Sequence, residues 1–150
     1  MKRILAVTVL SFFSLNVFSQ NEDPVSWNFA SRKKAAGTYE LVLTASIEHP
    51  WHIYSQYTPE GGPLPTKVEF QSNPLLKLQG KTIEEGHLES QHDKTFDLEV
   101  KYFSDQVAFV QTLTRKGTVK TGARGSVEYM VCNDGKCLPP VKKTFDIKLD

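Results

Sequence analysis

Apolar side chains alternate with polar ones in a series of short runs along this chain of 150 residues, and this pattern constrains the fold more than any other feature. A period of two indicates a strand with one buried face, whereas an amphipathic helix has a period of about 3.6 residues. Clear alternation is present at residues 25–30, 39–47, 127–132 and 145–149. No stretch has convincing helical periodicity, so the sequence predicts an all-β protein.

Turn-forming residues separate these runs. A turn is expected at residues 32–37, and a third short strand is expected at residues 51–54. Residues 58–65 contain three prolines and two glycines, which excludes a helix or a central strand and predicts a surface loop. Further short extended runs are expected at residues 68–70, 75–78, 98–103, 107–113 and 118–121, separated by segments such as Ala123-Arg124-Gly125. About eight or nine short strands predict an immunoglobulin-like antiparallel β-sandwich.

Both cysteines of the chain, Cys132 and Cys137, lie on either side of a predicted turn. The turn is Asn-Asp-Gly-Lys at residues 133–136, in which Asn and Asp bond to their own backbone and Gly135 is expected to take a positive φ. Opposed Cα atoms on neighbouring strands lie roughly 4.5 to 5.5 Å apart, which a disulfide can span. Two prolines follow, and they cannot donate to a ladder, so the returning strand is expected at a sheet edge and both cysteines near an exposed end.

The N-terminus has the layout of a secretory signal. A basic start at residues 1–3 precedes an apolar run at residues 4–13, and residues 17–19 form a small-residue cleavage site. We therefore predict a signal peptide over residues 1–19 and one exported domain over residues 20–150. No later segment approaches the roughly 20 apolar residues of a membrane helix. The net charge is +1 and no long run of basic residues is present, so the sequence does not indicate nucleic-acid binding.

Export predicts that Cys132 and Cys137 form a disulfide, but not what the disulfide does. A structural staple is one interpretation, although closing so small a loop stabilises by only about 2 kcal/mol in the chain-entropy model. The other interpretation is redox exchange, because accessible disulfides are the ones that partner thiolates attack. The residues by themselves leave both interpretations open.

Other polar and aromatic residues have ordinary interpretations beside functional ones. The four histidines and two cysteines lack the paired ligand spacing of structural zinc, so no metal and no cofactor is expected. His52 and Tyr54 lie on the same face of one short strand and either line a site or belong to the core. Residues 87–96 form a polar run that predicts a solvated loop, and Phe96 at its end either covers something or begins the next strand.

Three motifs give the chain a resemblance to a known family. They are Trp-His-Ile-Tyr-Ser at residues 51–55, Gly-Pro-Leu-Pro-Thr at 62–66 and Tyr-Met-Val-Cys-Asn-Asp-Gly-Lys-Cys-Leu-Pro-Pro at 129–140. Over residues 24–149 the chain resembles the N-terminal periplasmic domain of the thiol:disulfide interchange protein DsbD. The resemblance implies an immunoglobulin-like fold with a cysteine pair on a hairpin, shielded by a cap loop. It also implies electron transfer from a membrane partner to periplasmic disulfide proteins, with cytochrome c biogenesis as one setting.

The resemblance also implies roles for single residues. Cys137 corresponds to the sulfur that exchanges with partners and Cys132 to the resolving sulfur, with Tyr54 beside them and Phe96 as the cap aromatic. His52 stands where the best-known members have the first of two tyrosines. Residues 94–95, Lys-Thr, stand where those members have an acidic pair next to the cap aromatic.

The expected partners follow from the same resemblance. The chain ends at Asp150 without the membrane domain and the thioredoxin-like domain of full-length members, so we expect a monomer that works with separate partners. These are thioredoxin-like redox proteins and a membrane electron donor. The alternative function is a non-enzymatic immunoglobulin-like binding domain in which the disulfide only pins a hairpin.

Overall fold

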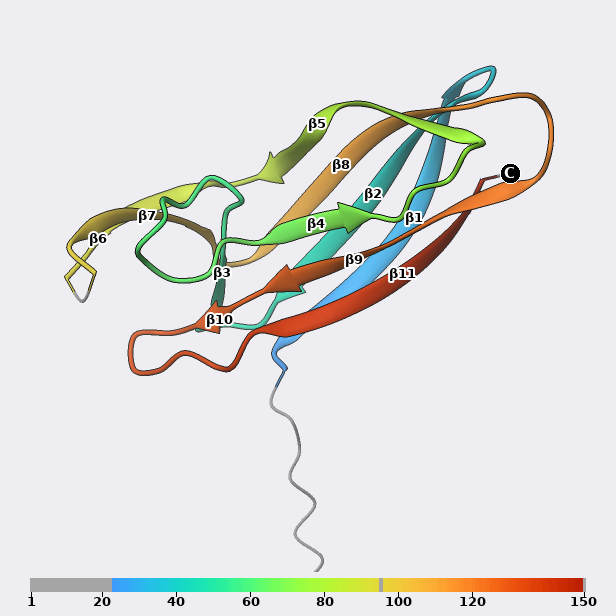
Figure 1. The fold of residues 1–150 in the computed structure, drawn as a ribbon. Coiled ribbons are helices and arrows are strands. Elements are labelled where there is room, and N and C mark those ends of the chain that lie inside the picture. The colour runs from blue at the N-terminus through green and yellow to red at the C-terminus, as the bar shows by residue number, and fades with distance from the viewer. Residues whose placement is uncertain (1–22, 95, 150) are drawn as a thin grey trace, which may run out of the picture.

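The computed structural model describes residues 23–94 and 96–149 (Figure 1). These residues form eleven strands and no helix, and so contain no helix with the length and apolar character needed to cross a membrane. The strands are β1 (Val25–Ala35), β2 (Thr38–Ile47), β3 (His52–Tyr54), β4 (Lys67–Phe70), β5 (Leu76–Gly86), β6 (Glu89–Asp93), β7 (Leu98–Phe103), β8 (Gln106–Arg115), β9 (Thr121–Tyr129), β10 (Val131–Cys132) and β11 (Val141–Leu149).

The strands form an antiparallel β-sandwich, as the alternation predicted. One layer has the order β1-β2-β8-β5, and the facing layer has the order β11-β9-β4. A third sheet, β10-β3-β7-β6, extends the sandwich at one end (Figure 1). The alternating side chains of β2 show how the core forms, because Tyr39, Leu41, Leu43 and Ala45 are at most 1% exposed. Each large apolar side chain buried in this way contributes about 1.5 to 3 kcal/mol.

The third sheet arises where strands change their pairing partner. β9 pairs with β11 as far as Tyr129, but the next two-residue strand, β10, pairs with β3 instead. The continuous strand predicted over residues 127–132 is therefore interrupted at Met130. β11 begins directly after Pro140 and lies at the edge of its sheet, as the two prolines predicted.

The prediction of a solvated loop at residues 87–96 was wrong, because this segment contains β6. β5 and β8 form a long hairpin that continues, beyond the close approach at Gly86, as the pair β6 and β7. A Cβ atom at Gly86 would lie 2.8 Å from the carbonyl oxygen of Gln106, which explains the glycine at this crossing point. β6 is an edge strand whose polar side chains are mostly exposed, so it shows no apolar alternation.

Three other boundaries differ from the predictions. β1 continues to Ala35 through a β-bulge, so the turn is shorter than residues 32–37. β5 extends well beyond residues 75–78, because pairing with β8 carries it to Gly86. Residues 118–120 are a connection, whereas Gly125 lies inside β9, where a Cβ atom would overlap the carbonyl oxygen of Glu69 and the ring of Phe145.

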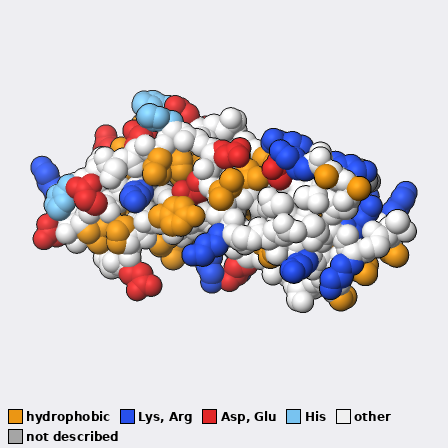
Figure 2. Space-filling view, turned by 90° about the horizontal axis from the view of Figure 1, so that it is seen from above, with side chains coloured by type: hydrophobic (Ala, Val, Ile, Leu, Met, Phe, Trp, Pro, Cys, Tyr) orange, Lys and Arg blue, Asp and Glu red, His pale blue; other side chains and the backbone are white. Residues whose placement is uncertain are grey.

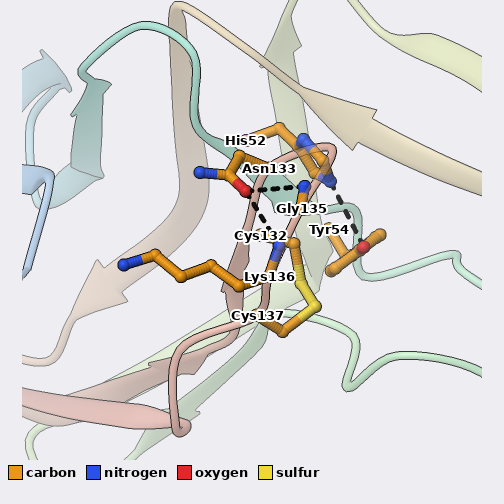
Figure 3. The surroundings of a disulfide bond; sticks show 7 residues. All are labelled: His52, Tyr54, Cys132, Asn133, Gly135, Lys136 and Cys137. Carbon is orange, nitrogen blue, oxygen red and sulfur yellow. Dashed lines mark hydrogen bonds between the residues drawn. A yellow bond between two sulfur atoms is a disulfide. The ribbon is translucent and has the colours of Figure 1, made fainter.

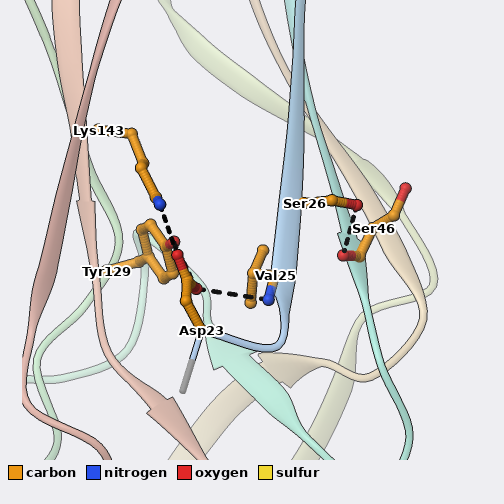
Figure 4. Close-up of polar contacts among 6 residues, drawn as sticks. All are labelled: Asp23, Val25, Ser26, Ser46, Tyr129 and Lys143. Atoms are coloured by element: carbon orange, nitrogen blue, oxygen red, sulfur yellow. Dashed lines mark hydrogen bonds and ion pairs between the residues drawn. The ribbon is translucent and has the colours of Figure 1, made fainter. Parts of the chain in front are cut away.

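The first described residues are fastened to the facing layer (Figure 4). The Asp23 carboxylate accepts hydrogen bonds from the Tyr129 hydroxyl at 3.0 and 3.2 Å and from the Val25 amide at 3.4 Å. It also forms an ion pair with Lys143 at 2.6 Å. Asp23 therefore ties the start of β1 to β9 and β11. The predicted signal peptide, residues 1–19, lies outside the described residues.

Candidate functional site

The two cysteines close a small loop at the end of the third sheet (Figure 3). Their sulfur atoms are 1.99 Å apart and their Cα atoms 4.0 Å apart. The Asn133 side chain organises the turn between them, because its Oδ1 accepts hydrogen bonds from the amides of Gly135 and Lys136, both at 2.9 Å. The Asn133 amide in turn donates to the carbonyl of Lys136 at 2.9 Å.

The expectation of a positive φ at Gly135 was wrong. Gly135 does not belong to the positive-φ glycines of the described chain, which are Gly37, Gly61, Gly80 and Gly117. The physical reason is the Asn133 side chain, which supplies the hydrogen bonds of the turn without any residue in the left-handed region.

The two cysteine residues differ in exposure. Cys132 is 1% exposed and lies in a small buried cluster with Tyr54 and Val100. Cys137 follows the turn, forms only an isolated bridge with Cys132, and is exposed. Both cysteines lie near an exposed end, where they line an open groove, but only Cys137 is itself exposed, because β10 is paired with β3 and covered.

Polar and aromatic side chains of β3 form one wall beside the disulfide. His52 lies opposite Cys132 in the β3–β10 register. Its Nε2 is 3.2 Å from the Tyr54 hydroxyl, and the two rings meet edge to face with centroids 5.2 Å apart. The Tyr102 ring of β7 lies 4.8 Å from the His52 ring. Both β3 side chains are less than a tenth exposed.

Burial shifts the pKa values of His52 and Tyr54 in this wall. It lowers the pKa of His52 below 6.5, because desolvation disfavours the imidazolium, although Asp134, Glu89 and Asp93 oppose that effect. It raises the pKa of Tyr54 to about 12, with a further contribution from Asp93. His52 and Tyr54 are therefore neutral near pH 7, and the hydrogen bond between them joins two uncharged side chains.

The tip of the β6–β7 hairpin forms the opposite wall. Together the two walls enclose an open groove of about 460 Å³, lined by His52, Tyr54, Phe96 and both cysteines. Phe96 is 43% exposed. The five candidate residues, which lie far apart in the sequence, therefore line one groove.

Three polar contacts shape the hairpin tip. The Phe96 amide donates to Asp93 Oδ1 at 3.3 Å. His92 lies 3.2 Å from an Asp97 carboxylate oxygen and 3.8 Å from a Glu99 oxygen. Asp97 has a φ of 55°, in the left-handed region that short polar side chains tolerate. These contacts lie within the hairpin and fix the local shape of the tip that carries Phe96.

Sequence reasoning missed Tyr102, Asn133 and the carboxylates that face His52. Tyr102 belongs to a run that was predicted as a strand, but only the pairing of Tyr54 with Tyr102 across β3 and β7 brings it to the site. Asn133 was predicted as a turn residue, and its specific hydrogen bonds require the structure. In the part of the chain that the structure describes, no group of three or more His, Cys, Asp or Glu side chains is arranged to hold a metal ion.

A sandwich with a disulfide at one end, one cysteine buried and the other exposed beside an aromatic groove, points to the immunoglobulin-like domains of thiol–disulfide interchange proteins. The chain belongs to the family of the N-terminal domain of the thiol:disulfide interchange protein DsbD, whose model matches residues 21–149. Domains of this family are periplasmic. The comparison with curated proteins gave no match.

Solved structures support the immunoglobulin-like fold at low sequence identity. The reduced DsbD N-terminal domain of Neisseria meningitidis is 18% identical with a TM-score of 0.50, covering 73% of this chain and 77% of its own. The N-terminal periplasmic domain of ScsB from Proteus mirabilis is 13% identical with a TM-score of 0.53, covering 84% and 45%. A complex of the DsbD and PilB N-terminal domains from Neisseria meningitidis gives 17% identity and a TM-score of 0.52, covering 87% and 88%.

Proposed function

We propose that this protein is a periplasmic thiol–disulfide exchange module that passes electrons from a membrane-side reductase to client disulfide proteins through Cys132 and Cys137. The unequal exposure of the two cysteine residues carries the proposal, because an exchange pair needs one cysteine that a partner can approach. Membership in the DsbD N-terminal family supports the same chemistry.

The proposed reaction has two steps. The Cys137 thiolate attacks one sulfur of a client disulfide, which forms a mixed disulfide and releases the other client sulfur as a thiolate. The Cys132 thiolate then attacks the Cys137 sulfur, which restores the Cys132–Cys137 disulfide and releases the second client thiolate. Two electrons pass to the client, and the released thiolates take protons from water. The membrane-side donor returns two electrons by the reverse route.

The proposal has four further parts, two of which come from the groove. Phe96 covers the sulfurs against small oxidants, since it lines the same groove at the hairpin tip. Neutral His52 and Tyr54 give the Cys132 side of the groove a weakly polar wall with little charge. The partners are thioredoxin-like redox proteins, which accords with the solved complex of a related domain with PilB. The module acts as a monomer after export.

A trapping experiment tests the roles of the two sulfurs. Cys132→Ser should accumulate a covalent complex with a thioredoxin-like partner, because the resolving sulfur is absent, whereas Cys137→Ser should give none. The complex is measured as a reductant-sensitive band on non-reducing gels. The opposite pattern would exchange the roles.

The alternative function, a binding domain with a structural staple, makes a different prediction. In that case neither variant forms a complex, and the reduction potential of the wild-type disulfide lies below about −300 mV. An exchange pair has a potential well above this value. Titration of the wild-type protein against redox buffers therefore separates the two functions even if a suitable partner is missing from the trapping assay.

A further inference from the structure

Charge is distributed unevenly along the long axis of the sandwich. Eight Lys and Arg residues belong to the chain segments at the end opposite the disulfide, which we call the basic end. Figure 2 shows Lys and Arg side chains gathered at this end of the molecule. The eight residues are those at positions 32–34, Lys77, those at positions 115, 116 and 120, and Lys148. Among the described residues only one carboxylate, Glu40, lies with them, and it pairs with Arg32 at 3.7 Å and Lys34 at 3.2 Å.

The pairing of the strands brings these cations together. Lys77 lies opposite Thr114, next to Arg115, and the Lys116 amide donates to the Leu75 carbonyl at 2.8 Å. The Arg115 guanidinium lies 5.3 Å from the Tyr39 ring and donates to the Leu149 carbonyl at 3.3 Å. Four chain segments therefore meet at one surface, so its charge density is a product of the fold and not of one basic run.

The basic end also presents an apolar side chain at its tip. Val119 is 61% exposed and lies in the β8–β9 connection, flanked by the exposed Lys116 and Lys120. Basic residues around an exposed apolar residue are the combination that suits the headgroup region of a bilayer. A cluster of this size gains attraction from every Lys or Arg that comes close to an anionic lipid surface.

The disulfide end carries charges of both signs. Asp93 and Asp134 line the groove together with Lys94 and Lys136. The exposed carboxylates of Asp97 and Glu99 lie beside His92 at the tip of the β6–β7 hairpin. β2 alone has ten residues, which separates the two ends of the sandwich by about 30 Å. This distance exceeds a Debye length of about 8 Å at physiological ionic strength, so an anionic surface attracts the basic end while the groove stays outside its field.

From this uneven distribution of charge we propose that the basic end docks on bilayers that contain anionic phospholipid. The disulfide groove then faces away from the bilayer. The inference is independent of the thiol–disulfide exchange proposed above, because it uses other residues at the opposite end of the molecule. The charge complementarity and the exposed Val119 select a lipid surface as the occupant.

Vesicle sedimentation tests the proposal. The mature protein should sediment with vesicles of phosphatidylglycerol and phosphatidylethanolamine, should stay in solution with phosphatidylcholine vesicles, and should be released at about 1 M salt. The double variant Lys116→Glu/Lys120→Glu should bind the anionic vesicles at least about tenfold more weakly.

The control variant, Lys67→Glu/Lys142→Glu, changes the net charge equally on the β4–β11 layer, away from the basic end. It should keep binding, and circular dichroism checks that both variants are folded. Equal loss in both variants would show that net charge alone is responsible and would overturn the proposal, as would the absence of sedimentation with anionic vesicles. Because no thiol reaction is measured, the result is separate from that of the trapping experiment.

Discussion

At the scale of single residues, Phe96 is expected to limit the access of oxidants to Cys137. If Phe96 covers the sulfurs, Phe96→Ala should speed oxidation of the reduced cysteine pair by a small-molecule disulfide several-fold. Leu88→Ala is a matched control, since Leu88 is 45% exposed, close to the 43% of Phe96, and does not line the groove. Equal rates in wild type and Phe96→Ala, with the fold intact, would remove Phe96 from the site.

His52 predicts a pH dependence of stability. Its pKa in the folded protein is lowered by burial, whereas in the unfolded chain it is about 6.5. As pH falls through 6.5 the unfolded chain takes up the proton first, so the free energy of unfolding decreases between this pH and the lower pKa of the folded state. Above pH 6.5 this residue has no such effect.

The variant His52→Gln should therefore lose less stability than wild type between about pH 7.5 and about pH 5, measured by urea unfolding with the disulfide intact. His87→Gln, which changes an exposed histidine, serves as the control and should follow wild type. If His52→Gln and wild type show the same decrease, a neutral buried His52 is not part of the folded state.

At the scale of elements, we predict different effects on stability for alanine substitutions of two glycines, although both lie near the C-terminal hairpin. Gly125 lies in β9 between β4 and β11, where a Cβ atom would overlap the Glu69 carbonyl and the Phe145 ring. Gly125→Ala should lower the free energy of unfolding by about 1 to 3 kcal/mol or more. Gly135→Ala should change it by no more than about 0.5 kcal/mol, because its nearest neighbour is an Asn133 oxygen at 3.7 Å. Urea unfolding of the two variants gives the comparison, and equal values would contradict it.

The elements also show which local patterns are reliable. The strand at Leu98–Phe103 has the bounds predicted for the short extended run at these residues. β6 was missed because an edge strand with mostly exposed polar side chains has no apolar period, so its formation depends on hydrogen bonds to β7. Residues 118–120 show the opposite case, since their composition suits a strand but no neighbouring strand pairs with them.

At the scale of the whole molecule, export remains a prediction that a mass measurement can check. The basic start and short apolar run predict that the periplasmic protein begins near Gln20. Asp23, three residues further, already contacts Tyr129 and Lys143, so cleavage near Gln20 would leave the sandwich intact. Intact-mass spectrometry of the periplasmic fraction should show loss of residues 1–19, and a mass that retains Met1 would contradict the signal peptide.

The sequence by itself determined the all-β class, the turn between the two cysteines and the position of β11 at a sheet edge. These features depend on period-two alternation, on turn chemistry and on the missing amide of proline, all of which act over a few residues. The sequence also named five candidate site residues, partly through the family resemblance, and their roles remain predictions.

Only the tertiary structure decided how these residues meet. The pairing of β10 with β3 places His52 opposite Cys132 and buries that sulfur, while Cys137 stays exposed. The β6–β7 hairpin brings Phe96 to the same groove, and the ends of four segments collect the basic residues at the far end. The physical reason is that strand pairing joins residues remote in the chain, and which strands pair is set by burial and hydrogen bonding of the whole sandwich, which no local window contains.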